Sequence, residues 1–314
     1  MVTGVQTCAL PIFLCSCISV RPPYLQKGDS VVIITPSSVI SEGSMKNGIK
    51  ILKEWGLNVI EDPKMYVQNV NRAGTPEERI ASFQHAINDP TIKAIFSARG
   101  GYGAITIADK IDFTPLKKNP KWLIGYSDIT GYHLAFNKMG VQTIHGTHPN
   151  DMGNSQTVEG LKQALFGGWK GITIDTNEYC IQGEATGKLV GGNLCLISAF
   201  ISSEYSIDTD GAILFLEEVN EYTYTMDRYI HLLRLNNKFK NIKGVVIGHL
   251  EGCAPGWHDL SPQKMLYDFF KEYNIPVMFG VPCGHAKPNL PLYLGSKVTL
   301  SVGPAESKLT FVDE

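Results

Sequence analysis

The residues best suited to chemistry begin with a serine at a sharp turn. Residues 122–128 read Trp-Leu-Ile-Gly-Tyr-Ser-Asp, and residues 129–139 have helical character. A strand that runs straight into a helix exposes the Ser127 hydroxyl beyond the carboxyl end of the sheet, beside the free N–H groups of the helix. The turn resembles a nucleophile elbow, although Ile129 replaces the usual second glycine. Ser127 is therefore a candidate nucleophile, and a helix N-cap is the alternative.

A glycine-rich segment ends the preceding strand. Residues 98–103 read Ala-Arg-Gly-Gly-Tyr-Gly, and glycines let backbone N–H groups approach a ligand closely, as an oxyanion hole requires. No Lys-Ser/Thr pair follows and the GxGxxG spacing is absent, so this is not a phosphate-binding loop of either common type. A simple tight turn is the alternative.

A serine nucleophile also needs a general base and a group that orients the base. His285 lies in a loop after the apolar run 277–281, and Glu217 and Glu218 end the apolar run 211–216. A carboxylate at the end of a buried strand is costly unless it is paired, so one of the two glutamates is a functional candidate. The alternatives are a solvated histidine and two solvated glutamates.

Two other histidines, His145 and His148, compete with His285. Their spacing suits a metal, but no carboxylate or further histidine lies near them, so no metal site is expected there. The cysteines beyond residue 20 are Cys180, Cys195, Cys253 and Cys283. They form no CxxC pattern, which argues against structural zinc and fits a reducing compartment. We expect no cofactor and no metal, and a cytoplasmic location.

The elements that must position these residues follow an alternating pattern. Apolar runs alternate with helical periodicity from residue 30 on, which favours a mostly parallel sheet flanked by helices. A capping box, Thr75 with Glu78, marks one helix start, with Pro76 in the first helical position. The expected strands are 30–35, 57–60, 94–97 and 122–125, and the expected helices are 44–55, one from 75, 104–110 and 129–139.

The pattern changes after about residue 150. Residues 151–187 are polar and contain glycine, and we interpret them as a linker. The expected fold is α/β, with an N-terminal, mostly parallel domain over 21–150 and an α+β, β-rich C-terminal domain over 188–314. In the second domain we expect strands at 212–216, 245–248 and 277–281, helices at 227–235 and 262–273, and hairpin-like segments at 292–300 and 308–312.

The composition narrows the class of protein. The 314 residues include 28 Lys and Arg against 30 Asp and Glu, a net charge of −2, and 43% are hydrophobic. These values exclude a disordered, collagen-like or disulfide-scaffold chain. The near-neutral balance also argues against a protein whose main task is to grip nucleic acid or an anionic membrane surface.

The first 20 residues differ from the rest. They hold no charged residue and three of the seven cysteines. Residues 1–12 resemble the translation of a common sequencing adapter and are excluded from fold reasoning, and 13–20 are interpreted as a truncated leader. No basic region precedes an apolar run, and Gly4, Gln6 and Pro11 interrupt any spanning helix. The alternative is the end of a lipoprotein signal with Cys17 as the lipidated residue, which implies a periplasmic location.

Five segments in series resemble the LD-carboxypeptidase family of serine peptidases, which also contains the microcin C self-immunity peptidases. The segments are GYSDIT, ARGGYG, GGNL, FLEEVNEYTYTMDR and GVPCGH with the N, LP and G that follow, and the resemblance covers about 22–309. It implies a triad assembled across two domains, with Ser127 as nucleophile, Glu217 as orienting carboxylate and His285 as general base. The N–H groups of Gly101 and Asp128 match the oxyanion hole.

The activity implied by the resemblance is removal of the terminal D-alanine that follows an L-diamino acid in murein tetrapeptide, a step of bacterial cell-wall recycling. Arg99 and Tyr102 are expected to contact the substrate, with Arg99 as the cation for its terminal carboxylate. A homodimer is implied, and the expected partner is a small peptide, with no nucleic acid and no membrane span. Departures at 146–149 and 201–204 leave the exact peptide open.

Two other functions stay open. The first is a peptidase or amidase that inactivates a peptide-nucleotide antibiotic, with aromatic residues around Trp257 stacked on the base. The second is a non-enzymatic α/β protein that binds a sugar or nucleotide, in which Ser127 only caps a helix. Loss of activity in a Ser127→Ala variant would distinguish an enzyme from such a binding protein.

Overall fold

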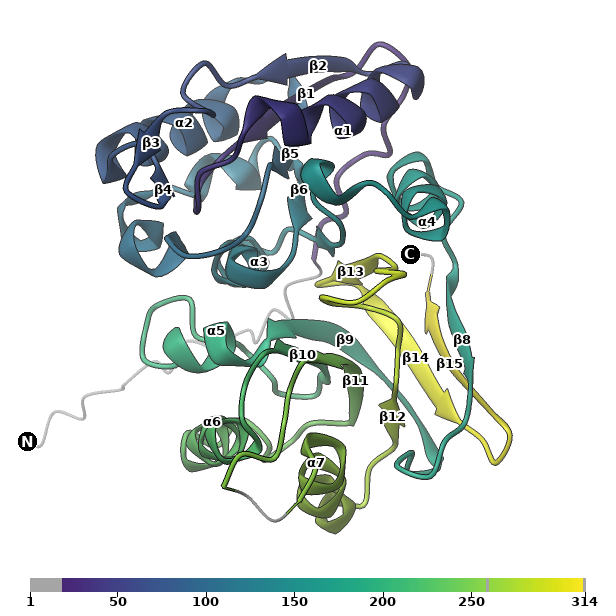
Figure 1. Cartoon of the computed structure of the whole chain (residues 1–314). Coiled ribbons are helices and arrows are strands. Elements are labelled where there is room, and N and C mark those ends of the chain that lie inside the picture. The colour runs from purple at the N-terminus through teal and green to yellow at the C-terminus, as the bar shows by residue number, and fades with distance from the viewer. Residues whose placement is uncertain (1–18, 258–259, 313–314) are drawn as a thin grey trace, which may run out of the picture.

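The strands of the protein form two large sheets, one above the other in Figure 1. The computed structural model describes residues 19–257 and 260–312, so residues 1–18, which include Cys17 and most of the leader, lie outside the described residues. The upper, six-stranded sheet has the order β13-β7-β6-β5-β1-β2. Its strands are β1 (Ser30–Ile34), β2 (Asn58–Glu61), β5 (Ile92–Ser97), β6 (Trp122–Gly125), β7 (Thr143–His145) and β13 (Leu292–Leu294).

The lower sheet has seven strands in the order β12-β11-β10-β9-β14-β15-β8. They are β8 (Gly171–Asp175), β9 (Gly183–Asn193), β10 (Ile213–Val219), β11 (Gly244–Glu251), β12 (Val277–Phe279), β14 (Lys297–Val302) and β15 (Glu306–Phe311). Strand β9 joins the antiparallel and the parallel part of this sheet, because it pairs antiparallel with β14 over 183–188 and parallel with β10 over 189–193. A further pair, β3 (Gln68–Asn69) and β4 (Arg72–Ala73), is small and separate.

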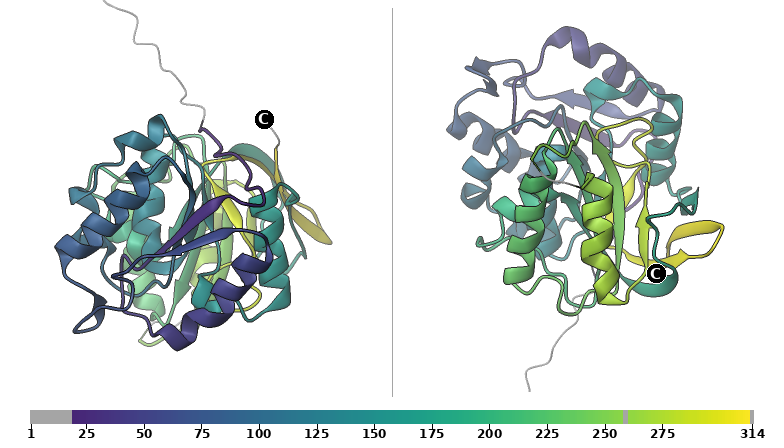
Figure 2. Two further views of the ribbon diagram at one scale, coloured as in Figure 1. Left: turned by 90° about the horizontal axis from the view of Figure 1, so that it is seen from above. Right: turned by 60° about the horizontal axis from the view of Figure 1, so that its bottom comes forward.

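The expected fold class is confirmed, because the upper sheet is parallel except for β13 and helices accompany both sheets (Figure 2). Both faces of the upper sheet are buried: along β1, Val32 and Ile34 enter one hydrophobic core while Val31 and Ile33 enter another. The helices are α1 (Glu42–Glu54), α2 (Pro76–Asn88), α3 (Thr130–Lys138), α4 (Ser155–Phe166), α5 (Leu194–Ala199), α6 (Thr223–Leu235) and α7 (Pro262–Phe270).

Several elements differ from their expected bounds. The segment 151–187 holds α4 and β8, and β9 begins before its end. The first half of β9 is largely exposed, so its sequence lacks the apolar run of a buried strand. The expected hairpin-like segment 292–300 is divided, since β13 pairs with β7 of the upper sheet and β14 with β9 of the lower sheet. The expected helix 104–110 is a pair of short 3-10 turns.

The arrangement brings functional candidates to strand ends. Strand β6 ends before Ser127, β5 before the Gly100–Gly101 turn, and β10 carries Glu217 near its end. In parallel sheets such carboxyl ends share one edge, where ligands bind. In the described part of the chain, no helix is both long enough and apolar enough to cross a membrane.

Candidate active site

Ser127 sits in a strained turn between β6 and α3. It has a φ of 64°, in the left-handed region that residues with a side chain rarely adopt. Residues 127–129 form a 3-10 turn that leads directly into α3. The N-cap position is Tyr126 for this turn and Ile129 for α3, and neither makes a side-chain cap hydrogen bond, so the helix N-cap alternative for Ser127 has no support from the geometry.

The glycine-rich turn after β5 lies against this serine. A Cβ added to Gly100 would be 2.9 Å from Ser127 Cβ and 3.3 Å from Ser127 Oγ. Gly101 has a φ of 111°, and a Cβ there would be 2.1 Å from Ser38 Oγ. Glycine is therefore required at both positions, one for the close approach and the other also for its backbone conformation.

The side chain of Asp128 has a structural role, in addition to the oxyanion-hole role that is expected for its backbone N–H. Its side chain is 1% exposed and accepts hydrogen bonds from Ser37 Oγ at 2.5 Å and from the backbone N–H of Ala104 at 2.8 Å. Burial raises the pKa of its carboxyl, against these hydrogen bonds. The carboxyl thus ties the loops after β1 and β5 to the nucleophile turn.

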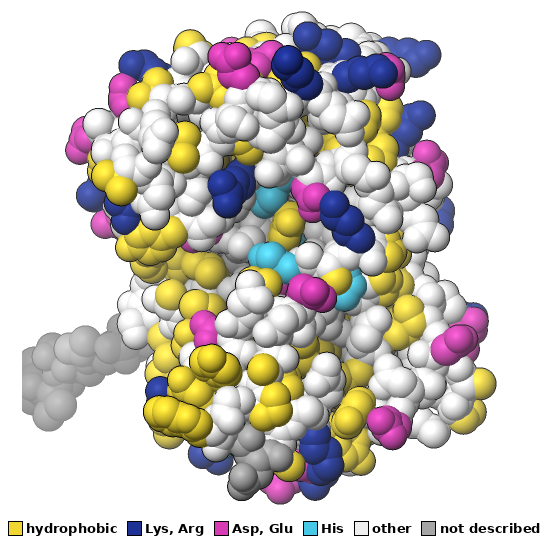
Figure 3. Space-filling view, in the orientation of Figure 1, with side chains coloured by type: hydrophobic (Ala, Val, Ile, Leu, Met, Phe, Trp, Pro, Cys, Tyr) yellow, Lys and Arg dark blue, Asp and Glu magenta, His cyan; other side chains and the backbone are white. Residues whose placement is uncertain are grey.

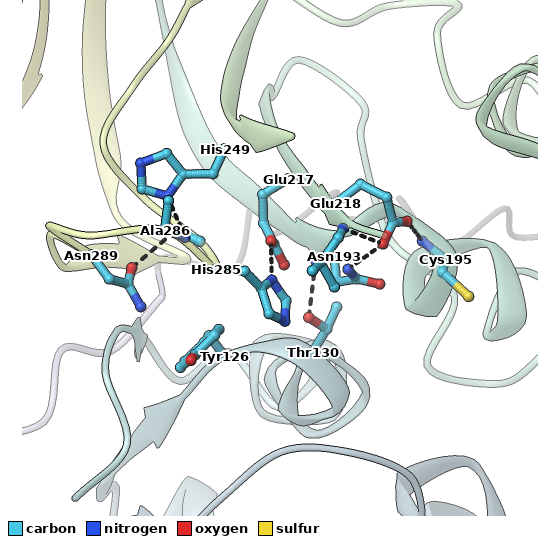
Figure 4. Close-up of polar contacts among 12 residues, drawn as sticks. Tyr126, Thr130, Asn193, Cys195, Glu217, Glu218, His249, His285, Ala286 and Asn289 are labelled. Carbon is cyan, nitrogen blue, oxygen red and sulfur yellow. Dashed lines mark hydrogen bonds and ion pairs between the residues drawn. The ribbon is translucent and has the colours of Figure 1, made fainter. Parts of the chain in front are cut away.

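Glu217 and His285 form the second part of the site. His285 Nδ1 lies 2.7 Å from Glu217 Oε2 (Figure 4). The Glu217 side chain is fully buried, whereas that of His285 is 16% exposed. Burial opposes protonation of His285, but the hydrogen bond to Glu217 and its charge outweigh it, so the pKa of His285 is raised. The alternative of two solvated glutamates fails, because Glu218 is also only 2% exposed.

The loop that carries His285 is held by residues that the sequence did not single out. Ala286 donates its N–H to His249 Nδ1 at 3.1 Å, and Gly284 donates its N–H to Asn289 Oδ1 at 2.9 Å. A Cβ at Gly284 would be 2.8 Å from Glu217 Oε2. The loop is therefore fixed at both sides of the histidine, and its glycine makes room for the carboxylate.

Tyr126 connects the serine turn with the histidine. Its ring lies edge-to-face against His285, with centroids 4.9 Å apart, and is stacked on His148 at 4.4 Å. Since Tyr126 precedes Ser127, its contact with His285 brings the turn of Ser127 close to that imidazole. In Figure 3, histidine side chains gather in a hollow between the two halves of the molecule, with Lys/Arg and Asp/Glu side chains at its rim.

The competing histidines, His145 and His148, are buried. His145 and His148 are 0% and 3% exposed and lie near the buried His133. Burial lowers the pKa of His133 to about 4 and that of His148 to about 3, so all three imidazoles are neutral at pH 7. Among residues 19–257 and 260–312, no three His, Cys, Asp or Glu side chains are grouped as metal ligands would be.

The two expected substrate contacts lie on the glycine-rich turn. Arg99 is exposed and donates to Val39 O at 3.3 Å, and it lines a surface cavity of about 390 Å³ with Ser41, Asn150 and others. Tyr102 is 47% exposed, and the Arg72 guanidinium lies 4.6 Å from its ring centroid. Both side chains are therefore accessible from solvent.

A serine in a strained turn beside a His–carboxylate pair is the arrangement of a serine-type hydrolase. The chain belongs to the LD-carboxypeptidase family: residues 31–146 match its N-terminal domain and residues 186–300 its C-terminal domain. Membership makes it a serine-type carboxypeptidase by class, and it confirms the resemblance of the sequence segments. The chain is 30% identical to a probable murein peptide carboxypeptidase of Bacillus subtilis, over 90% of this chain and 92% of that protein.

Other relatives represent both branches of the resemblance. The microcin C7 self-immunity protein MccF of Escherichia coli is 25% identical, over 88% of this chain and 91% of that protein. A solved muramoyltetrapeptide carboxypeptidase from Oxalobacter formigenes has the same fold, with a TM-score of 0.81 and 24% identity over 90% of this chain and 99% of that one.

Proposed function

We propose that the protein removes the terminal D-alanine of murein tetrapeptide by cleaving its bond to the L-diamino acid, with Ser127, Glu217 and His285 as the catalytic triad. The observation that carries this proposal is the 2.7 Å contact between Glu217 and His285, beside the strained turn of Ser127. The family and its murein peptide relative support the reaction class.

The proposed reaction is acyl transfer in two steps. The Ser127 hydroxyl attacks the scissile carbonyl, and His285 takes its proton as the new C–O bond forms. The imidazolium then gives this proton to the leaving amine of D-alanine as the C–N bond breaks. Water, deprotonated by His285, hydrolyses the acyl-enzyme and restores the serine. Glu217 fixes the Nδ1–H tautomer and stabilises the imidazolium throughout.

The oxyanion is assigned to the N–H groups of Gly101 and Asp128. Asp128 directly follows Ser127, and Gly101 follows Gly100, which packs against Ser127. The Asp128 carboxyl holds the neighbouring loop through Ala104. Such a donor contributes about 3 kcal/mol to transition-state stabilisation in comparable enzymes. Arg99, exposed on the same glycine-rich turn, is proposed to bind the terminal carboxylate, and Tyr102 to cover the peptide.

The test measures, by mass spectrometry, the release of D-alanine from disaccharide-tetrapeptide. We expect release by the wild type and a fall in kcat of about 10³-fold or more for Ser127→Ala. Thr130→Ser, three residues away, is a control that keeps a hydroxyl in the same helix. No release by folded wild type would refute the murein substrate, and full activity of Ser127→Ala would refute the nucleophile.

A second candidate function is cleavage of a peptide-nucleotide conjugate, favoured by one exposed feature. Tyr222, Tyr224 and Trp257 form a continuous stack, with ring centroids 5.6 and 5.8 Å apart and interplanar angles of 14° and 17°. Trp257 is 92% exposed, and aromatic faces of this kind stack on bases. Parallel assays with an aminoacyl sulfamoyl adenosine and the murein peptide, on wild type and Trp257→Ala, would separate the two functions: only nucleotide cleavage should need Trp257.

The homodimer stays a prediction of the family resemblance, and the cytoplasmic location stays a prediction of the cysteine pattern. Light scattering of the purified chain at micromolar concentration would measure the first, with a mass near twice 34.5 kDa for a dimer. Cell fractionation of the source organism would measure the second. A lipidated, membrane-associated form would favour the lipoprotein alternative for the leader.

A further inference from the structure

A chain of hydrogen bonds joins the nucleophile helix to the strand of Glu217, and the proposed triad chemistry does not use it. Asn193, the last residue of β9, donates its backbone N–H to Thr130 Oγ1 at 3.0 Å and its side-chain Nδ2 to Glu218 Oε1 at 2.7 Å. Thr130 lies three residues after Ser127, and Glu218 follows Glu217 in β10. Figure 4 shows these contacts beside His285.

The side chains of Asn193 and Glu218 have a partner for every polar atom. Glu218 Oε1 also accepts from the N–H of Val219 at 3.0 Å, and Oε2 accepts from the N–H of Cys195 at 2.8 Å. Asn193 Oδ1 accepts from the N–H of Leu196 at 3.2 Å and so caps α5. A buried network that is fully satisfied holds its members in one geometry.

The backbone is also shaped for this contact. Thr130 is fully buried, and Gly192 has a φ of 142°, where a Cβ would be 2.6 Å from Thr130 Oγ1. Only glycine lets the end of β9 come this close to the first turn of α3. Asn193 in turn lies opposite Glu217 in the parallel pairing of β9 and β10. The contact therefore links the two sheets at the level of the candidate triad.

We infer that Thr130, Asn193 and Glu218 are positioning residues that set the distance between Ser127 Oγ and the His285 imidazole. The inference rests on the proposed function, because it takes Ser127 as nucleophile and His285 as base. The nucleophile follows a strand of one sheet and the base follows a strand of the other, so their alignment depends on what fixes the sheets to each other. A misplacement of about 1 Å in such a pair costs on the order of 100-fold in rate.

The first test compares Thr130→Val, which removes the acceptor for the Asn193 N–H, with Thr130→Ser, which keeps it. The main readout is the rate at which a fluorophosphonate labels Ser127, because this reagent needs an aligned Ser–His pair but no peptide subsite. The kcat and KM for disaccharide-tetrapeptide and the melting temperature are measured alongside. Thr209→Val is the matched control, since it removes a buried hydroxyl that donates to Lys238 O before β10.

For Thr130→Val we expect labelling and kcat to fall by about 10- to 100-fold, with KM within about threefold. Thr130→Ser and Thr209→Val should keep labelling within about threefold, even where Thr209→Val lowers the melting temperature as much. Unchanged labelling of Thr130→Val, or an equal loss in the Thr209→Val control, would overturn the inference. A wild type that is not labelled at all would refute the proposed nucleophile, and the inference with it.

A second test exchanges the donor and the acceptor of the Asn193–Glu218 pair and does not depend on Thr130. Asn193→Asp alone sets two carboxyls against each other. Glu218→Gln alone replaces one acceptor oxygen with an NH2 group, which must face either the Asn193 amide and the N–H of Val219 or the N–H of Cys195. The double variant restores one carboxyl facing one amide, with the donor on the opposite strand. We expect the labelling rate of each single variant to fall by about 10- to 100-fold. The double variant should be labelled at least tenfold faster than the slower of the two single variants. No recovery in a folded double variant would contradict a positioning role for this pair.

Discussion

The two sides of the candidate site are held by different physical means. On the side of Ser127, the proposed nucleophile, the backbone conformation holds the site: Ser127 has a φ of 64°, and Gly100 lies so close that a Cβ added to it would be 2.9 Å from Ser127 Cβ. On the side of His285, the proposed base, buried carboxyl groups hold the site, because Glu217 and Glu218 are 0% and 2% exposed and each is hydrogen-bonded. The nucleophile side should therefore be sensitive to added atoms, and the base side to removed charge.

The largest effect is expected when charge is removed from the base side. Glu217→Gln keeps the shape of the side chain but loses the negative charge that stabilises imidazolium, and we expect kcat to fall by about 10³- to 10⁴-fold. Since Glu217 raises the pKa of His285, its loss should lower that pKa. His285 acts as base only when neutral, so the acid limb of kcat/KM should move to lower pH, as measured between pH 5 and 9. An unmoved acid limb would contradict the assignment of His285 as base.

The next effect is expected when an atom is added to the nucleophile side. In Gly100→Ala the new methyl group would meet Ser127 Cβ at 2.9 Å and Tyr126 O at 3.3 Å, so the turn must shift. We expect kcat to fall by about 10- to 100-fold, with a smaller change in KM. Gly43→Ala is the control, because nothing lies within 4 Å of a Cβ there and the helix gains stability. Equal kinetics of the two variants would show that the turn tolerates added volume.

Much of the contrast between the two sides of the site could be predicted from the sequence, because apolar runs show where the strands end. The apolar runs before Ser127 and Glu217 and the capping box of Thr75 and Glu78 are local patterns, and the structure has each of them. The contact of Asn193 with Glu218 spans 25 residues and depends on β9 lying beside β10. Strand order is not a local property, so no periodicity could reveal this contact.

The sequence also does not reveal that the chain returns to the upper sheet at β13. Strand β13 is a three-residue apolar segment that resembles part of a hairpin, yet it pairs with β7, far back in the sequence. The loop before it carries His285, so this return anchors His285 beside the sheet that carries Ser127. The buried carboxyl of Asp128 was missed for a similar reason, since its partners Ser37 and Ala104 lie in other loops.

The buried histidines and the buried carboxyl of Glu218 should respond oppositely to acid. His133 and His148, behind the nucleophile strand, have folded-state pKa values lowered by burial to about 4 and 3. The unfolded chain binds their protons near pH 6.5, so their contribution to stability is complete above that pH and is lost as pH falls towards 4. Burial raises the pKa of Glu218 to about 7, so between pH 4.5 and 7 the folded state holds its proton and acid adds stability.

Denaturant unfolding at pH 7.0, 5.5 and 4.5 measures this balance. We expect the free energy of unfolding to fall as the pH is lowered. Each of the two histidines lowers it by on the order of 3 kcal/mol, and Glu218 raises it by about as much as one histidine lowers it. Glu218→Gln should steepen the fall, because the acid-stabilised group is gone. His133→Gln should flatten it. Identical slopes for all three proteins would mean that these buried groups do not set the acid stability.

The smallest effect is expected for the exposed ion pair between the two sides. Lys287 Nζ, in the loop of His285, lies 2.6 Å from Asp151 Oδ1, and the two side chains are 49% and 31% exposed. An exposed pair contributes at most about 1 kcal/mol and is screened by salt. Lys287→Met keeps the aliphatic stem, and we expect kcat within about threefold of wild type and a difference that shrinks from 20 mM to 500 mM salt. A loss as large as that expected for Thr130→Val would mean that this surface contact, and not the buried Asn193–Glu218 pair, aligns the two sides.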